Sequence, residues 1–282
     1  MRNPSRPFVM ERPLFLGAFL TIAMTCFFII TGLSRTMNTS FSCMYTGVDS
    51  TASVMQTQLL AIVHYATTRD LPQLTLPEIR SLFDVLLSAA PCNFLVFGLG
   101  HDSLMWAALN PRGTTFFLEE DPKLVHKILA RAPALRVYTV TYRTQLYEAD
   151  HLLSSYKTEI ECLPPHVYLQ GNNKCRLALN ELPDDVYNRE WDVIFIDAPR
   201  GYYAEAPGRM ATIFTAAVMG RTRKKRGVTH VFLHDVDRKV EKMYAEEFLC
   251  NKYLVKSVGK LWHFRIPPGA YVFQGKAGWK FC

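Results

Sequence analysis

The stretch Phe94-Leu95-Val96-Phe97-Gly98-Leu99-Gly100 decides the fold of this chain. Its four apolar residues form a short continuous run, which is typical of a strand buried on both faces of a parallel sheet. The two glycines that follow permit a tight turn in which the backbone approaches a ligand closely. We therefore expect an α/β fold with a ligand site where this strand ends.

Segments of the same kinds alternate on both sides of this stretch. Helices are expected around residues 59–63 and 79–87, and then at 103–109, 122–131, 209–220 and 239–248. Further strands are predicted at 114–118, 136–141, 191–196 and 229–233. This alternation indicates a doubly wound, mostly parallel, Rossmann-like sheet, and residues 253–256 and 261–266 are predicted to end it as an antiparallel hairpin.

The composition suits one globular domain with one membrane anchor. The 282 residues are 49% hydrophobic and 20% charged, which excludes a disordered chain and a polytopic membrane protein. The net charge of +7 predicts an anionic partner. Nucleic acid, a membrane surface, a nucleotide-like cofactor and an acidic glycan all fit that charge.

Residues 14–33 contain no charged side chain and would form a helix of about 30 Å, long enough to span a bilayer. Arg2, Arg6 and Arg12 place the N-terminus in the cytosol by the positive-inside rule. A cleaved signal peptide would have a shorter apolar region and a small-residue cleavage site. We expect a cytosolic tail at 1–13, a transmembrane signal anchor at 14–33, a lumenal stem at 34–55 with a glycosylation sequon at Asn38, and a catalytic domain at 56–282.

Six cysteines follow the predicted anchor: Cys43, Cys92, Cys162, Cys175, Cys250 and Cys282. An even number is compatible with disulfides in an oxidising compartment, and several pairings are open. Cys162 and Cys175 flank an irregular stretch with Pro-Pro and Gly-Asn-Asn, so we expect a local bridge between them. The spacing of the cysteines does not indicate a zinc site.

Residues after the first two strands form a candidate cofactor site, because ligands collect at the carboxyl ends of parallel strands. They are Gly98, Gly100, His101, Asp102 and Ser103, followed by Glu119 and Glu120. The position of Glu119 suits a carboxylate that accepts hydrogen bonds from a ribose diol, in S-adenosylmethionine or a nicotinamide dinucleotide. Ser103 stands where the dinucleotide fingerprint has its third glycine, and the final hairpin favours methyl transfer. Alternatively, Asp102 caps the next helix.

Asp197 follows the fourth strand, and His234 and Asp235 follow the fifth. Methyl transfer to a hydroxyl requires positioning of the methyl group and removal of the hydroxyl proton, and these three residues are the catalytic candidates. Two acids at adjacent strand ends also suit a divalent metal cation, with Asp197 and Asp235 as ligands. The alternative is that Asp235 and Asp237 cap the following helix.

Four longer stretches resemble the plant glucuronic acid 4-O-methyltransferase family. They are CNFLVFGLGHDSLMWAALNP from Cys92, FFLEED from Phe116, WDVIFIDAPRGYYAEAPGRM from Trp191 and THVFLHDVDRKVE from Thr229. The resemblance implies a single-pass type II Golgi membrane enzyme that transfers a methyl group from S-adenosylmethionine to O4 of glucuronic acid side chains of glucuronoxylan or arabinogalactan. The family includes irregular-xylem-type proteins of xylan biosynthesis, but GHDSLMW and EAPGRM look more like the methyltransferase branch.

Candidate substrate residues lie in the third of these stretches. Arg200 and Arg209 suit a glucuronate carboxylate because a guanidinium binds it bidentately, although Arg209 can instead pair with Glu205. Tyr202 and Tyr203 can stack on sugar rings. The basic run at 221–226 is either a solvated loop or a surface that attracts acidic polysaccharide.

The resemblance implies an acidic polysaccharide, the Golgi membrane and other enzymes of wall-polysaccharide synthesis as partners, and no nucleic acid. Two other functions stay open. One is a non-catalytic scaffold of the same fold that assists xylan synthesis, and the other is a nicotinamide-dependent sugar oxidoreductase.

Overall fold

The computed structural model describes residues 48–68, 73–269 and 281–282, with side chains from residue 54 onward. The predicted cytosolic tail and signal anchor, and the stem as far as residue 47, lie outside the described residues. Among the described helices, none is long and apolar enough to cross a membrane. Val54–Cys282 form one compact unit, which contains the sheet and the candidate site.

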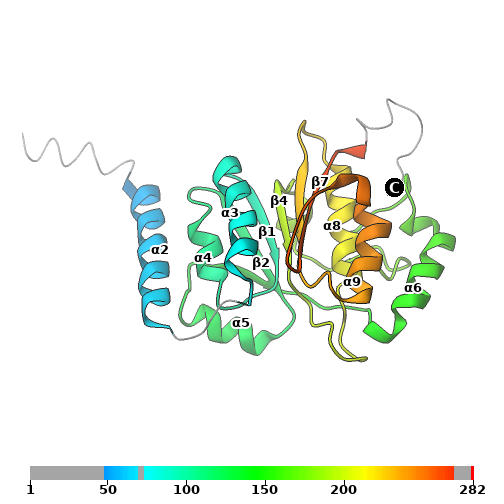
Figure 1. Ribbon diagram of the computed structural model, residues 1–282, viewed down its shortest axis with the longest axis horizontal. Helices are drawn as coiled ribbons and strands as arrows, with labels where there is room; N and C mark the ends of the chain where they lie inside the picture. The colour runs from blue at the N-terminus through cyan, green and yellow to red at the C-terminus, as the bar shows by residue number, and fades with distance from the viewer. Residues whose placement is uncertain (1–47, 69–72, 270–280) are drawn as a thin grey trace, which may run out of the picture. The chain divides into compact units, whose positions relative to one another are not determined.

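The described residues form one seven-stranded sheet in the order β3-β2-β1-β4-β5-β7-β6 (Figure 1). The strands are β1 Asn93–Phe97, β2 Thr114–Glu119, β3 Arg136–Thr139, β4 Val193–Ile196, β5 Thr229–Leu233, β6 Leu254–Val258 and β7 Leu261–Ile266. Strands β1 to β5 are parallel, whereas β7 pairs antiparallel with β5 and β6. The predicted sheet and final hairpin are confirmed. Strand order reverses between β1 and β4, which creates the crevice where ligands bind.

Helices pack on both faces of the sheet, with α3 and α4 on one face and α8 on the other (Figure 1). The described α-helices are α2 Val48–Thr67, α3 Leu76–Ala89, α4 Ser103–Ala108, α5 Pro122–Leu129, α6 Ala149–Ser155, α7 Asp184–Tyr187, α8 Met210–Thr222 and α9 Lys239–Tyr244. The predicted helix at 239–248 is α9 followed by a π-helical turn, Ala245–Leu249. Between β3 and β4, beyond α6 and α7, the chain is largely irregular, with 3-10 turns at Leu146–Glu148, Tyr156–Thr158 and Ile160–Cys162.

Strand β1 is apolar at successive positions because it contributes to two cores. Leu95 and Phe97 pack in the cluster that contains α8, whereas Phe94 and Val96 pack on the other face with α3 and α4. All four side chains are buried. This two-sided burial explains the continuous apolar run, because successive side chains of a strand point to opposite faces.

Two disulfides are present among the described residues of the domain. The predicted bridge between Cys162 and Cys175 is confirmed, and a second bridge joins Cys250 to Cys282. Cys92 is a buried free thiol, and Cys43 lies outside the described residues. The first bridge closes part of the long β3–β4 connection, which contains little regular structure to hold it in place.

Candidate functional site

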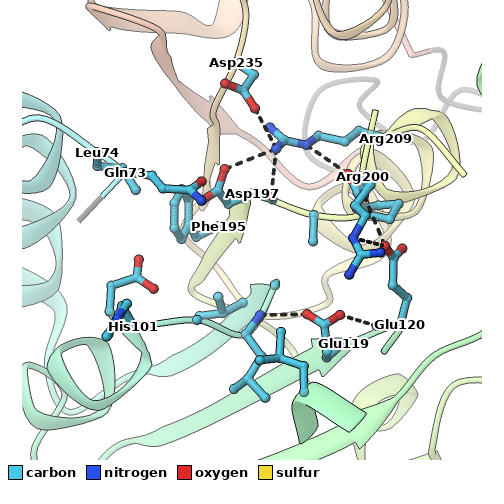
Figure 2. A pocket seen from close by; sticks show the side chains of 18 of the residues that line it. Gln73, Leu74, His101, Glu119, Glu120, Phe195, Asp197, Arg200, Arg209 and Asp235 are labelled. Atoms are coloured by element: carbon cyan, nitrogen blue, oxygen red, sulfur yellow. Dashed lines mark hydrogen bonds and ion pairs between the residues drawn. The ribbon is translucent and has the colours of Figure 1, made fainter. Parts of the chain in front are cut away.

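A cavity of about 350 Å³ opens where β1, β2, β4 and β5 end (Figure 2). From the predicted cofactor set, it is lined by Gly98, Gly100, His101, Asp102, Glu119 and Glu120. From the predicted catalytic and substrate sets, it is lined by Asp197, Asp235, Arg200, Tyr202 and Arg209. Ser103 and His234 are buried beside this cavity. The structure therefore brings together residues that lie up to 137 positions apart in the chain.

The turn after β1 needs its first glycine. Gly98 has φ of +124°, and a Cβ atom there would lie 3.3 Å from the Cβ of Ala198. The Gly100 N–H donates to the Ser103 hydroxyl over 2.9 Å, and Ser103 is 1% exposed. The buried Ser103 hydroxyl therefore holds the turn on the side away from the cavity, and the two glycines line the cavity.

Asp102 occupies the N-cap position of α4, but its side chain does not make a capping hydrogen bond. Instead its Oδ2 accepts from the indole Nε1–H of Trp106 over 2.7 Å. Burial, together with the negative charge of Asp197, raises the pKa of Asp102 to about 6. A largely neutral carboxyl therefore lines the cavity at mildly acidic pH.

The two acids at the end of β2 have different environments (Figure 2). Glu119 accepts three backbone N–H groups: Leu99 at 3.0 Å, and Glu120 and Asp121 at 2.9 Å each. It thus ties the β1 turn to the β2 turn. Glu120 has a buried Oε2 without a hydrogen-bond partner among the described residues, and burial raises the pKa of its carboxyl. The ribose contact of Glu119 stays a prediction.

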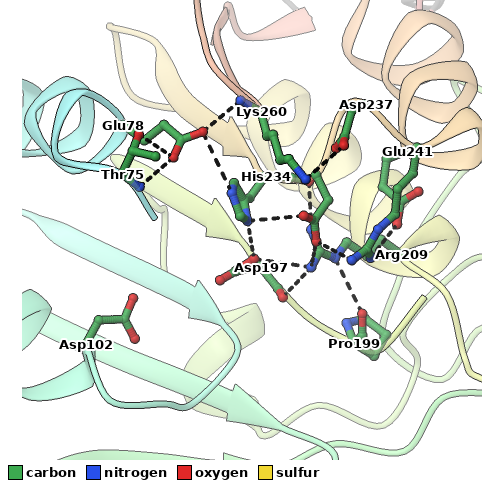
Figure 3. Close-up of polar contacts among 12 residues, drawn as sticks. Thr75, Glu78, Asp102, Asp197, Pro199, Arg209, His234, Asp237, Glu241 and Lys260 are labelled. Atoms are coloured by element: carbon green, nitrogen blue, oxygen red, sulfur yellow. Dashed lines mark hydrogen bonds and ion pairs between the residues drawn. The ribbon is translucent and has the colours of Figure 1, made fainter. Parts of the chain in front are cut away.

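The three catalytic candidates meet at the ends of β4 and β5 (Figure 3). His234 Nδ1 lies 2.8 Å from Asp197 Oδ1 and 3.6 Å from Asp235 Oδ1. Burial alone would lower the pKa of His234, but the hydrogen bond to Asp197 and the charges of both carboxylates raise it above its ordinary value. Asp197 and Asp235 line the cavity, whereas the buried His234 contacts both carboxylates from the side that faces the protein core.

Asp235 does not have the predicted capping role. The N-cap of α9 is Arg238, and Asp235 has φ of +60°, a left-handed conformation that aspartate tolerates better than most residues. Its carboxylate pairs with Arg209 and Arg238. Asp237, the other proposed cap, forms an exposed ion pair with Lys260.

Arg209 differs from the predicted substrate clamp. Its guanidinium is 4% exposed and donates to the backbone oxygens of Asp197 (2.6 Å) and His234 (2.7 Å) and to Asp235 Oδ2 (2.8 Å). Asp197 Oδ1 lies 3.2 Å from the same group. A bidentate grip on a substrate carboxylate would require breaking these contacts, so a contact between Arg209 and the substrate stays a prediction. Glu205, the alternative partner, is not the acid that Arg209 contacts.

Glu78, which was not among the predicted site residues, belongs to this cluster. It is 2% exposed and accepts from the N–H and hydroxyl of Thr75, at 2.7 Å each, in a capping box at the start of α3. Its Oε1 accepts from Lys260 N–H at 2.7 Å and lies 3.9 Å from His234 Nε2. The Thr75-to-Glu78 spacing of a capping box can be recognised in the sequence, but the proximity of Glu78 to His234 cannot.

Asp197, His234 and Asp235 also form a candidate metal centre. One ligand atom from each lies within 4.8 Å of the others, and two carboxylates with an imidazole are donors suited to divalent cations. Arg209 contacts Oδ1 of Asp197 and Oδ2 of Asp235. Asp197 Oδ1 also lies 2.8 Å from His234 Nδ1, so one oxygen of each carboxylate is already engaged within the protein.

Two of the substrate candidates, Arg200 and Tyr202, line the cavity, and Tyr203 packs against Tyr202. Arg200 is about half exposed and lies 3.6 Å from Glu120 Oε1 and 3.4 Å from Asp121 Oδ2. Tyr202 and Tyr203 are exposed and pack edge to face, with ring centroids 5.2 Å apart. These side chains are accessible, but their contact with a substrate stays a prediction.

Comparison with known proteins gives consistent matches. The family model IRX15/IRX15L/GXM matches residues 77–264. Arabinogalactan O-methyltransferase 1 of Arabidopsis thaliana is 61% identical over 226 residues, covering 80% of this chain and 78% of that protein. Arabinogalactan O-methyltransferase 2 of the same plant is 51% identical, with 97% and 96% covered. Glucuronoxylan 4-O-methyltransferase 1 of Arabidopsis thaliana is 46% identical, covering 79% of this chain and 78% of that protein.

Proposed function

The chain belongs to the IRX15/IRX15L/GXM family, and we propose that it transfers a methyl group from S-adenosylmethionine to O4 of glucuronic acid in arabinogalactan. The 61% identity to an arabinogalactan O-methyltransferase, against 46% to a glucuronoxylan 4-O-methyltransferase, favours arabinogalactan over glucuronoxylan. The observation that carries the proposal is the single cavity that unites the glycine turn, the β2 acids and Asp197 at the switch point of the sheet.

The cavity suits the proposed cofactor in two ways. The glycine turn brings backbone close to the bound molecule, and the buried Oε2 of Glu120 is an acceptor without a partner among the described residues. A hydroxyl of a ribose would satisfy that oxygen, because a buried acceptor is costly when it is left unpaired. S-adenosylmethionine supplies a methyl group that is already activated by its sulfonium.

The chain must then orient the acceptor hydroxyl and take its proton. Asp197 lines the cavity, and its Oδ1 is held by His234 and Arg209, so its position is set before substrate binds. We assign Asp197 as the proton acceptor, with its Oδ2 as the receiving atom. His234 acts behind it by holding the carboxylate in place.

A divalent cation is part of this proposal as an alternative route to the same step. Asp197, Asp235 and His234 would hold it. The cation would lower the pKa of the acceptor hydroxyl. Chelation separates the two routes: activity that is lost with a chelator and restored by a divalent ion supports the cation, and activity that is indifferent to the chelator supports direct removal by Asp197.

We also propose that the domain is lumenal in the Golgi, anchored by residues 14–33 with the N-terminus in the cytosol. The charge pattern of the N-terminal segment supports this topology. In sealed microsomes, added protease should spare the domain until detergent is added. Digestion without detergent would overturn the orientation.

The central experiment incubates the full chain with methyl-labelled S-adenosylmethionine and purified arabinogalactan, glucuronoxylan or carboxyl-reduced arabinogalactan. We expect label in arabinogalactan, less in glucuronoxylan and none in the reduced polymer. Asp197→Asn should retain cofactor binding by calorimetry and lose turnover, because an amide does not accept the proton.

The remaining outcomes separate the alternatives. Cofactor binding without transfer to either polymer would refute the acceptor assignment. Failure to bind S-adenosylmethionine would refute the enzyme and favour the scaffold. A rise in melting temperature with a nicotinamide dinucleotide would instead favour an oxidoreductase.

A further inference from the structure

We infer that a second binding site for acidic polysaccharide lies at the amino-terminal ends of the parallel strands, opposite the methyl-transfer cavity at their carboxyl ends. The identity of the polymer rests on the proposed function. The site is a cavity of about 450 Å³ between the loop at 167–170, the segment at 187–190 and the end of α8 with residues 222–224. It uses Arg223 and Lys224 of the basic run at 221–226, whereas Arg221 is buried and donates hydrogen bonds to the backbone oxygens of Ala217 and Phe281.

Strand direction separates the two cavities. Trp191 precedes β4 and the loop at 223–228 precedes β5, whereas Asp197 and Asp235 follow these same strands. These strands have four and five residues, at about 3.3 Å per residue, so the two cavities at their opposite ends lie roughly 15 Å apart. A short acceptor that occupies the methyl-transfer cavity therefore leaves the second cavity open to a distant part of the same polymer.

The first wall of the second cavity is held rigidly. The bridge between Cys162 and Cys175 closes the loop that contains Tyr168. Fully buried Asn172 donates its side-chain amide to the Tyr168 carbonyl over 2.8 Å and to the Glu161 carbonyl over 2.9 Å. The Tyr168 side chain is 46% exposed at the cavity, as expected of an aromatic ring that packs against a sugar.

The second wall carries more cationic side chains than acidic ones. Arg189, Arg223 and Lys224 line the cavity, and the exposed side chains of Lys225 and Arg226 follow them. The acids on this face are used locally. Glu190 accepts the backbone N–H groups of Lys224 (2.9 Å) and Lys225 (3.3 Å), and Asp192 pairs with Arg223 at 2.8 Å.

This arrangement selects a polyanion rather than a single anion. Exposed ion pairs each contribute little free energy, so one carboxylate would bind weakly to these side chains. A polymer with carboxylates along its length gains from several such contacts, and binding at one site raises its effective concentration at the other. Acidic polysaccharide fits because it combines repeated carboxylates with pyranose faces for Tyr168.

The test neutralises the exposed cations in the full chain with Lys224→Ala, Lys225→Ala and Arg226→Ala together. Methyl transfer is measured on intact arabinogalactan and on a short fragment with one glucuronate. We expect a three- to tenfold rise in KM for the polymer, unchanged kcat, and unchanged kcat/KM for the fragment. The control variant, Lys242→Ala with Lys256→Ala and Arg265→Ala, removes the same charge from exposed positions elsewhere and should leave the polymer KM unchanged.

Several results would overturn the second site. They are an unchanged KM for the polymer, an equal rise for fragment and polymer, and an equal effect of the control variant. Loss of binding to phosphatidylserine vesicles with an unchanged KM for the polymer would assign the surface to membrane instead. If the wild-type chain methylates no polymer, the proposed function fails, and calorimetry with arabinogalactan on both variants still decides whether the site exists.

Discussion

Replacement of Arg209 by methionine should destabilise the folded domain by about 3–5 kcal/mol. The guanidinium is 4% exposed and bridges the ends of β4 and β5 through Asp197, His234 and Asp235. Methionine retains an apolar stem of similar length but donates no hydrogen bond. The change leaves two carboxylates facing each other with little solvent, and removing one partner of a buried ion pair is costly for that reason.

The expected loss is large enough to measure. In a domain of more than 200 residues, each kcal/mol shifts Tm by about 2–4 °C, so the variant should melt roughly 6–20 °C below wild type. The assay is thermal and urea unfolding of the detergent-solubilised full chain. Arg200→Met is the matched control, because its guanidinium is about half exposed and its pairs with Glu120 and Asp121 should contribute about 1 kcal/mol or less.

A double-mutant cycle locates the cause. If Arg209 stabilises the domain by neutralising the acid pair, Asp235→Asn should reduce the cost of Arg209→Met, and the two losses should not add. A Tm for Arg209→Met equal to that of Arg200→Met would refute the buried-bridge reasoning. Strict additivity with Asp235→Asn would refute the pairing with that carboxylate.

Three further predictions concern other residues of the domain. Asp102 has a pKa of about 6 against an ordinary 3.8. The stability that its neutral form contributes is therefore present below about pH 4 and is lost as pH rises through 6. Tm measured against pH should show this loss in wild type and not in Asp102→Asn. Glu119→Ala should weaken S-adenosylmethionine binding by about 1–3 kcal/mol in calorimetry, because Glu119 holds the backbone of both turns beside the Glu120 acceptor. Unchanged affinity would show that these contacts of Glu119 do not contribute to cofactor binding. Joint replacement of Cys162 and Cys175 by serine removes a disulfide with a sequence separation of 13. The free energy of unfolding measured in urea should fall by about 3 kcal/mol. Equal stability of this variant and wild type would contradict a stabilising role for the disulfide.

Local patterns carried most of the fold. The apolar run at 94–97 and the glycines after it predicted a buried parallel strand and its turn, and the alternation of strands and helices predicted the sheet. Four stretches of sequence predicted the family, which is confirmed. These features are readable because side-chain periodicity, turn residues and motif spacing involve neighbours in the chain. The glycine turn after β1 was predictable for the same reason.

Contacts between distant segments required the tertiary structure. Arg209 was predicted to bind a glucuronate carboxylate because a guanidinium matches that group, but the approach of β4 and β5 buries it among carboxylates of the protein itself. Glu78 was not predicted as part of the site, and only the tertiary structure brings it to the β6–β7 turn and to His234. Sequence determines which groups are present and on which elements they lie. Packing decides which of them lose water and find partners, and that sets their charge, their pKa and their access to substrate.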